Sequence, residues 1–114
     1  MVNDAASFDP AGFEVLVDHR DDAIVLCLVG EVDLSNAEQI TEALDQERLE
    51  CATTLVIDAH GLEFCDSSGI AALARVARAC DAHDVTMSIV GVRPSIRRLF
   101  EVAGALNMLH VEPE

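Results

Sequence analysis

The stretch Thr53–Cys80, TTLVIDAHGLEFCDSSGIAALARVARAC, predicts a strand that leads into an amphipathic helix. Thr53–Ile57 is a short apolar run, and Asp58–Gly61 is expected to end it. From Ile70 onward, apolar residues recur at helical spacing and arginines fall on the opposite side. A strand followed directly by such a helix is the repeating unit of α/β folds.

The residues before this stretch predict a hairpin. Phe13, Val15 and Val17 alternate with polar residues, which is typical of a strand with one face in water. After a turn at residues 20–22, Ala23–Val29 is continuously apolar and predicts a strand covered on both faces.

A helix is expected next, capped by Ser35 or Asn36 and ending near residues 48–50. Its predicted inner face consists of Ala37, Ile40 and Leu44.

Three more elements are expected in the C-terminal part. Residues 85–89 alternate as a strand does, and Pro94 suits the first turn of a helix that Gly104 stops. The buried face of that helix is expected to comprise Ile96, Leu99, Phe100 and Ala103. Residues 106–111 are predicted to form a last strand.

The predicted fold class is therefore α/β, in the order β-β-α-β-α-β-α-β. Right-handed crossovers make the sheet mostly parallel, and the hairpin adds an antiparallel edge. One domain is expected over residues 13–111, with a flexible tail at residues 1–12 and a C-terminal tail at residues 112–114.

The charge of the chain is strongly negative. Seven Arg, no Lys and 21 acidic residues give a net charge of -14, and residues 1–66 contain 16 of the acids. Because 51% of the residues are apolar, the chain is expected to fold despite this charge. Nucleic acids and anionic membranes are disfavoured as partners, and basic proteins are favoured.

The sequence indicates a cytoplasmic location. Residues 1–12 contain no basic residue, unlike the start of a secretory signal, and the longest apolar run is too short to cross a membrane. The four cysteines form no C-x-x-C pair and are expected to be reduced thiols, so we expect neither a metal nor a cofactor.

Two loops qualify as a functional site. In open α/β sheets, sites gather at the carboxyl ends of strands. Gly30–Asp33 and Asp66–Gly69 both follow predicted strands and are expected to lie close together. The second segment places two hydroxyls at a helix N-terminus, where helix capping alone would account for one of them.

The two segments together resemble the STAS domain of bacterial anti-sigma factor antagonists. The resemblance rests on G-E-V-D at residues 30–33 and F-C-D-S-S-G-I at residues 64–70, and it extends to R-R-L-F at residues 97–100 and to Gly104. It covers residues 13–111, and Cys65 departs from the larger or different apolar residue usual in the family.

The resemblance implies that Ser67 is phosphorylated by a partner that is both an anti-sigma factor and a serine kinase. Asp33 would lie beside the phosphorylation site, together with Asp66, Ser68 and Gly69. The unmodified protein would bind the kinase and release a sigma factor, and a serine phosphatase would reset the phosphorylated form. The partner surface is expected to include Glu31, Asp33, Ser35, Glu63, Arg75 and Arg78. The oligomeric state is not decided by the sequence, which is compatible with a monomer and with a weak dimer.

The sequence also allows three other functions to be compared with this one. Asp58 follows a strand, as the phosphorylated aspartate of a response regulator does, but a chain without Lys lacks a residue that such receivers require. A thiol or serine enzyme is disfavoured because Ser67 is outside G-x-S-x-G and Cys65 adjoins the charge of Asp66. A STAS interaction module of a stressosome-like assembly, a lipid-transport complex or a transporter stays open.

Overall fold

The computed structural model describes residues 12–113 of the chain. Its elements are, in order, β1 (Phe13–Arg20), β2 (Ala23–Val32), α1 (Glu38–Glu42), α2 (Gln46–Cys51), β3 (Thr54–Cys65), α3 (Ser67–Ala82), β4 (Thr86–Val90) and α4 (Pro94–Val102). The single-domain α/β prediction is confirmed, and the observed order is β-β-α-α-β-α-β-α. Of the predicted N-terminal tail, residues 1–11 lie outside the described residues.

The four strands form one mixed sheet in the order β1-β2-β3-β4. The first pair is antiparallel and the other two pairs are parallel, as predicted. Asp21 turns the β1–β2 hairpin with a φ of 53°, in the left-handed region that Asp tolerates better than most residues. No helix within residues 12–113 is both long and apolar enough to cross a membrane.

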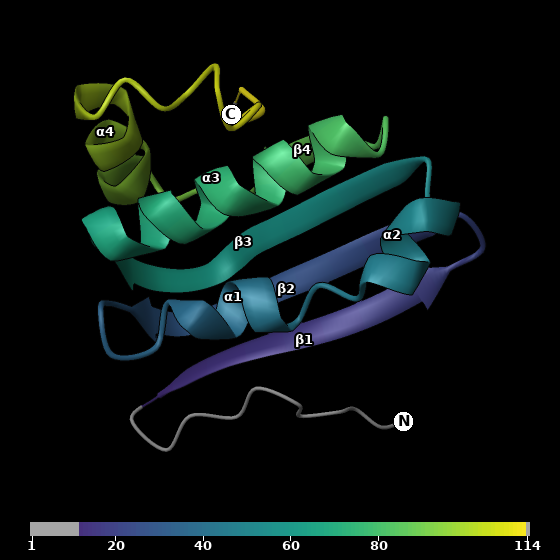
Figure 1. Ribbon diagram of the computed structural model, residues 1–114. Coiled ribbons are helices and arrows are strands. Elements are labelled where there is room, and N and C mark those ends of the chain that lie inside the picture. The colour runs from purple at the N-terminus through teal and green to yellow at the C-terminus, as the bar shows by residue number, and fades with distance from the viewer. Residues whose placement is uncertain (1–11, 114) are drawn as a thin grey trace.

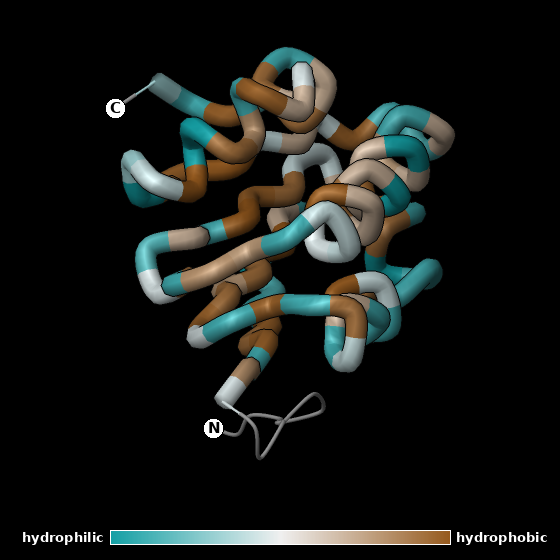
Figure 2. The backbone as a smooth tube through the Cα atoms, turned by 90° about the vertical axis from the view of Figure 1, so that its left-hand side faces the viewer, coloured by the Kyte–Doolittle hydropathy of each residue, from teal (hydrophilic) through white to brown (hydrophobic). Residues whose placement is uncertain are grey.

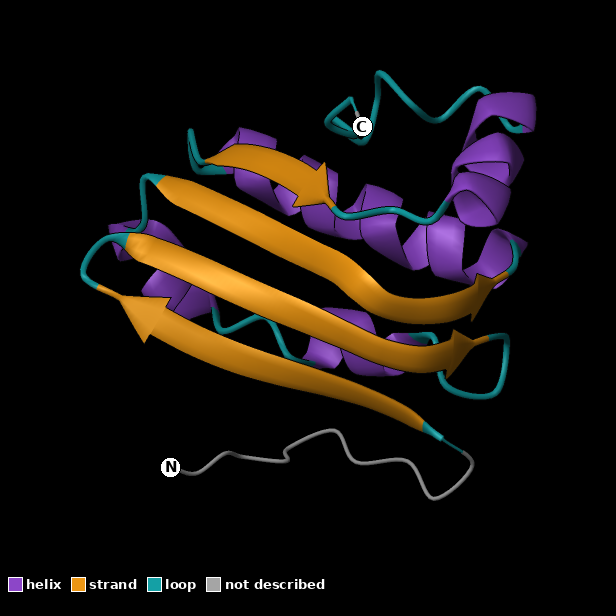
Figure 3. Ribbon diagram, turned by 180° about the vertical axis from the view of Figure 1, so that it is seen from behind, coloured by secondary structure: helices purple, strands orange, loops and turns teal. Residues whose placement is uncertain are grey.

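The helices α1, α2 and α3 lie on one face of the sheet, and Figure 3 views the opposite, open face. Ile24, Leu26 and Leu28 of β2 are buried on the helical side, whereas Val29 on the open side is 39% exposed. The prediction that β2 is covered on both faces is therefore wrong. Successive right-handed crossovers that move in one direction across a sheet place their helices on the same face. Figure 2 shows hydrophobic residues concentrated along the strands and hydrophilic ones in the outer turns.

The expected single helix after β2 is two short helices. The carboxylate of Asp45 accepts a hydrogen bond from the Glu47 amide at 2.9 Å and starts α2, so the chain breaks where one helix was predicted to continue. The predicted cap is also wrong, because α1 begins after Ala37 with no side-chain hydrogen bond at its cap. Ile40 and Leu49 supply the buried side chains of the two helices.

Strand β3 is longer than predicted and continues through Asp58 to Cys65. Strand β2 accompanies it throughout, so that Val32 pairs with Cys65 after two register shifts. Asp58, which was expected to lie where the strand ends, is therefore a residue inside the strand.

The C-terminal segment differs from the predicted last strand. Within residues 106–111 only Val111 forms a bridge, with Ile89 of β4, and His110 has a φ of 54° that interrupts extended backbone. In α4, Ile96 and Phe100 are buried as predicted, whereas Leu99 and Ala103, the residue that follows α4, are exposed. In the predicted C-terminal tail, the amide of Glu112 donates a hydrogen bond to the carbonyl oxygen of Ile89 at 2.9 Å.

Candidate functional site

The two sequence segments meet at the carboxyl ends of β2 and β3, as expected. Gly69 lies in the first turn of α3, directly against both strands. A Cβ atom at this position would lie 2.5 Å from Cys65 Sγ and 2.9 Å from Val32 Cγ1. Glycine therefore lets the start of α3 approach the sheet closely, and this contact joins the G-E-V-D and D-S-S-G segments.

Asp66 caps α3. One oxygen of its carboxylate accepts hydrogen bonds from the amides of Ser68 at 2.9 Å and Gly69 at 3.3 Å. Asp66 therefore caps the helix, and the hydroxyls of Ser67 and Ser68 are not needed as caps. Ser67 is the exposed first residue of the helix, whereas Ser68 is half-buried.

The loop after β2 is held by short-range hydrogen bonds. Asp33 Oδ1 accepts the amide of Ser35 at 2.9 Å and its hydroxyl at 2.6 Å. The hydroxyl and then the amide of Ser35 lower the pKa of Asp33 below its ordinary value, because both stabilise the carboxylate.

Asn36 organises the same loop in a way that the sequence did not predict. Its side chain accepts the Asp33 amide at 2.9 Å and donates to the Glu31 carbonyl at 3.1 Å, and the residue is only 5% exposed. Its buried amide fixes the path from β2 to α1. In the sequence, the only signal is an Asn beside a predicted helix start, which indicates a helix cap as readily as a loop.

Two hollows flank the start of α3. The first, of about 290 Å³, is lined by Leu34, Ser35, Ala37, Glu38, Ser68, Ala71 and Arg75. The second, of about 380 Å³, is lined by Glu63, Phe64, Cys65, Asp66, Ser67, Ser95, Ile96 and Leu99. The two adjacent serines thus open onto different hollows, and α4 forms one wall of the hollow at Ser67.

The structure brings most of the predicted surface together. Ser35 and Arg75 share the hollow at Ser68, and Glu63 shares the hollow at Ser67. Glu31 is exposed at the end of β2, where it pairs with Phe64. Arg78 lines neither hollow and lies about 16 Å along the helix axis from Ser67.

The chemistry of the cysteine beside the site disfavours thiol catalysis. Cys65 is 2% exposed, and burial, with a smaller contribution from the charge of Asp66, raises the pKa of its thiol to about 12. The thiol therefore stays protonated at neutral pH. All four cysteines are free, and within residues 12–113 no group of three or more His, Cys, Asp or Glu is arranged to hold a metal ion.

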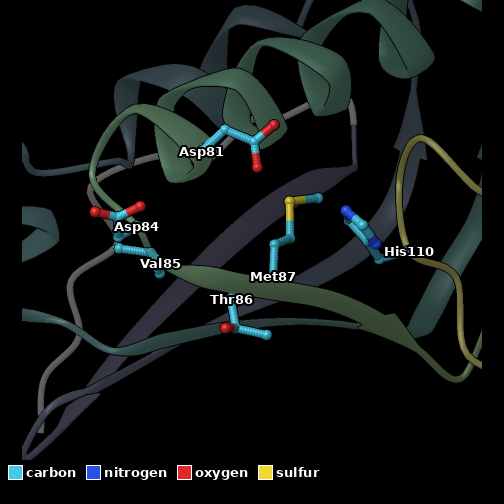
Figure 4. A pocket seen from close by; sticks show the side chains of 6 residues that line it. All are labelled: Asp81, Asp84, Val85, Thr86, Met87 and His110. Atoms are coloured by element: carbon cyan, nitrogen blue, oxygen red, sulfur yellow. The ribbon is translucent and has the colours of Figure 1, made fainter.

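A further hollow, of about 320 Å³, lies at the other end of α3. Figure 4 shows Met87 of β4 and His110 on its lining, with Asp81 above them on the last turn of α3. None of the predicted site residues contributes to it.

Comparisons with known proteins identify the family of this chain. The family model of the STAS domain matches residues 14–114. An anti-sigma-B factor antagonist of Staphylococcus aureus is 27% identical over 82 residues, which cover 72% of this chain and 76% of that protein.

Two solved structures share the fold. The anti-sigma factor antagonist SpoIIAA in its unphosphorylated form superposes with a TM-score of 0.72 at 22% identity, covering 88% of this chain and 89% of that one. The phosphorylated form of SpoIIAA from Bacillus superposes with a TM-score of 0.64 at 22% identity, covering 88% and 92%. With the family model matching nearly the whole described chain, this protein belongs to the STAS domain family.

Proposed function

We propose that this chain is an anti-sigma factor antagonist that works in the cytoplasm by partner switching. Its unphosphorylated form binds an anti-sigma factor serine kinase and so frees a sigma factor. Phosphorylation of Ser67 ends this binding, and a serine phosphatase restores it. The observation that carries the proposal is the exposed Ser67 at the start of a helix whose cap is already made by Asp66.

The two serines are not equivalent as phosphate acceptors. A kinase must reach the hydroxyl oxygen, and Ser67 is exposed whereas Ser68 is half-buried. Ser67 is also the first serine of D-S-S-G, the position that the family resemblance indicates. Exposure and family position therefore favour the same residue.

A phosphate at Ser67 suits a switch that leaves the fold intact. It adds about 1.5 to 2 negative charges at a helix N-terminus, where the helix dipole stabilises them. The surface changes more than the fold, because Glu63 and Asp66 already line the hollow at Ser67. A coupling of about 1–3 kcal/mol between phosphate and partner would change affinity roughly 5- to 150-fold.

The relatives support the same role. The Staphylococcus aureus relative is named an anti-sigma-B factor antagonist, and SpoIIAA has been solved in unphosphorylated and phosphorylated forms. These properties belong to those proteins, and their transfer to this chain is part of the proposal.

The test is phosphorylation and pull-down with an anti-sigma factor serine kinase from the source organism. With ATP, wild type and Ser68→Ala should gain phosphate on Ser67, as located by phosphopeptide mass spectrometry, whereas Ser67→Ala should gain none. Ser67→Asp should bind the kinase more weakly than wild type does. Phosphorylation of Ser67→Ala, or wild-type binding by Ser67→Asp, would overturn the proposal.

A further inference from the structure

The hollow at Ser67 has an apolar wall that the fold does not use. Phe64 and Leu99 line it with 48% and 37% of their surface exposed, beside the buried Ile96. Val102, three residues after Leu99 on α4, is 79% exposed. Residues three apart on a helix share a face, so Val102 extends the apolar surface beyond the hollow.

Helix α4 is thus apolar on two sides. Ile96 and Phe100 face the core, whereas Leu99 and Val102 face solvent. Figure 1 shows this helix beside the N-terminal end of α3, where Ser67 begins the helix. Contiguous exposed apolar side chains with a polar rim are typical of a protein-binding surface.

The rim of the hollow identifies the chemistry of the partner. Glu63 and Asp66 line it, and the exposed Glu31 is paired with Phe64 on the neighbouring strand. A second copy of this chain, with its own net charge of -14, would be repelled. The acidic rim instead complements a segment with Arg or Lys beside an apolar side chain.

We propose that this hollow, called here the Ser67 groove, docks such a basic-flanked apolar segment of the anti-sigma factor kinase. The inference rests on the proposed function and adds how the kinase is recognised. Phe64 and Leu99 supply the apolar contact, and Glu63 and Asp66 supply the charge contact. Docking there holds the kinase over the hydroxyl of Ser67.

The groove also explains why phosphorylation would release a basic partner instead of strengthening its binding. Docking an apolar side chain removes water from the groove, which Ser67 lines. A phosphate dianion at that point must lose hydration when the partner closes over it, and this loss is costly. Apolar contact and phosphate therefore exclude one another.

The experiment compares groove variants with variants of equal exposure elsewhere. Phe64→Ala is matched by Met108→Ala, since both side chains are 48% exposed, and Leu99→Ala is matched by Leu16→Ala, since both are 37% exposed. Steady-state phosphorylation of Ser67 is measured with the kinase and ATP. We expect the KM of each groove variant to rise about tenfold with kcat little changed, and each control to stay within about twofold of wild type.

Two further results separate this inference from the proposed function. If wild type gains no phosphate on Ser67, both fail together. If wild type is phosphorylated but groove variants and controls share its KM, the groove inference alone is overturned.

A charge variant keeps the test valid should an alanine variant fail to fold. Glu63→Gln removes one exposed charge and little packing. It should raise KM at low ionic strength and lose this effect at high ionic strength, because salt screens exposed charges. An unchanged KM at low ionic strength would contradict the charge contact.

Discussion

Gly69 sets how closely α3 approaches the sheet, and its replacement tests this packing. Gly69→Ala would gain helix propensity of up to about 1 kcal/mol but place a Cβ against Cys65 and Val32. We expect overlap to dominate, with a net loss of about 1–3 kcal/mol in the free energy of unfolding. Urea unfolding followed by circular dichroism suits a chain without Trp or Tyr.

The control is the same substitution in a Cys65→Ala background. Removing the sulfur opens space on one side of the new methyl group, so the loss should become smaller. An equal loss in both backgrounds would show that overlap with Cys65 is not the cause.

The four cysteines should differ in reactivity. Burial raises the pKa of Cys65 to about 12 and that of Cys80 to about 11, whereas Cys51 is exposed. Because a raised pKa lowers the thiolate fraction at neutral pH, native protein should be alkylated first at Cys51 and last at Cys65 and Cys80. Mass spectrometry of time points at several pH values checks the order. Rapid labelling of Cys65 near neutral pH would reopen the thiol-enzyme alternative.

The residue types in the sequence predicted where the site lies better than they predicted the hydrogen bonds within it. Ser67 and Asp66 could be placed at a helix start because polar residues directly precede an apolar helical repeat. The roles of Ser35 and Asn36 could not, because both cap helices and both also stabilise turns. Only the three-dimensional path of the loop selects Asp33 and Glu31 as their partners.

At the scale of elements, Asp66 is expected to stabilise α3 more than Asp45 stabilises α2. Asp66 accepts two amides at the start of a 16-residue helix, whereas Asp45 accepts one at the start of a 6-residue helix. Asp66→Ala should lower the free energy of unfolding by about 0.5–2 kcal/mol. Asp66→Asn should keep most of the wild-type stability, because Asn also caps helices. Urea unfolding of both variants and Asp45→Ala measures the difference. A smaller loss for Asp66→Ala than for Asp45→Ala would contradict the assignment.

The predicted helices and strands are confirmed where a long local sequence pattern decides the structure. Helix α3 and the β1–β2 hairpin follow from periodicity over many residues. The open face of the sheet could not be predicted from residues 23–29, since helix placement depends on the hand and direction of later crossovers. The break between α1 and α2 at Asp45 could not be predicted either, because an exposed acid suits a helix surface as well as a helix start.

For the whole molecule, the charge imbalance predicts that salt stabilises the fold. The whole net charge of -14 lies before Ser67, and most of these acids are on the hairpin, on α1 and α2 and in the intervening loops. Repulsion among these carboxylates opposes the compact state, and raising sodium chloride from about 0.01 M to about 1 M shortens the Debye length from about 30 Å to about 3 Å.

The melting temperature, measured by circular dichroism, should therefore rise by several degrees over this range. Glu42→Gln with Glu50→Gln, both at exposed positions of the acidic helices, should begin from a higher melting temperature at low salt and gain less from added salt. This comparison separates charge screening from the general strengthening of hydrophobic burial by salt, which both proteins share. If the two proteins gained equally, self-repulsion in this region would not be limiting stability.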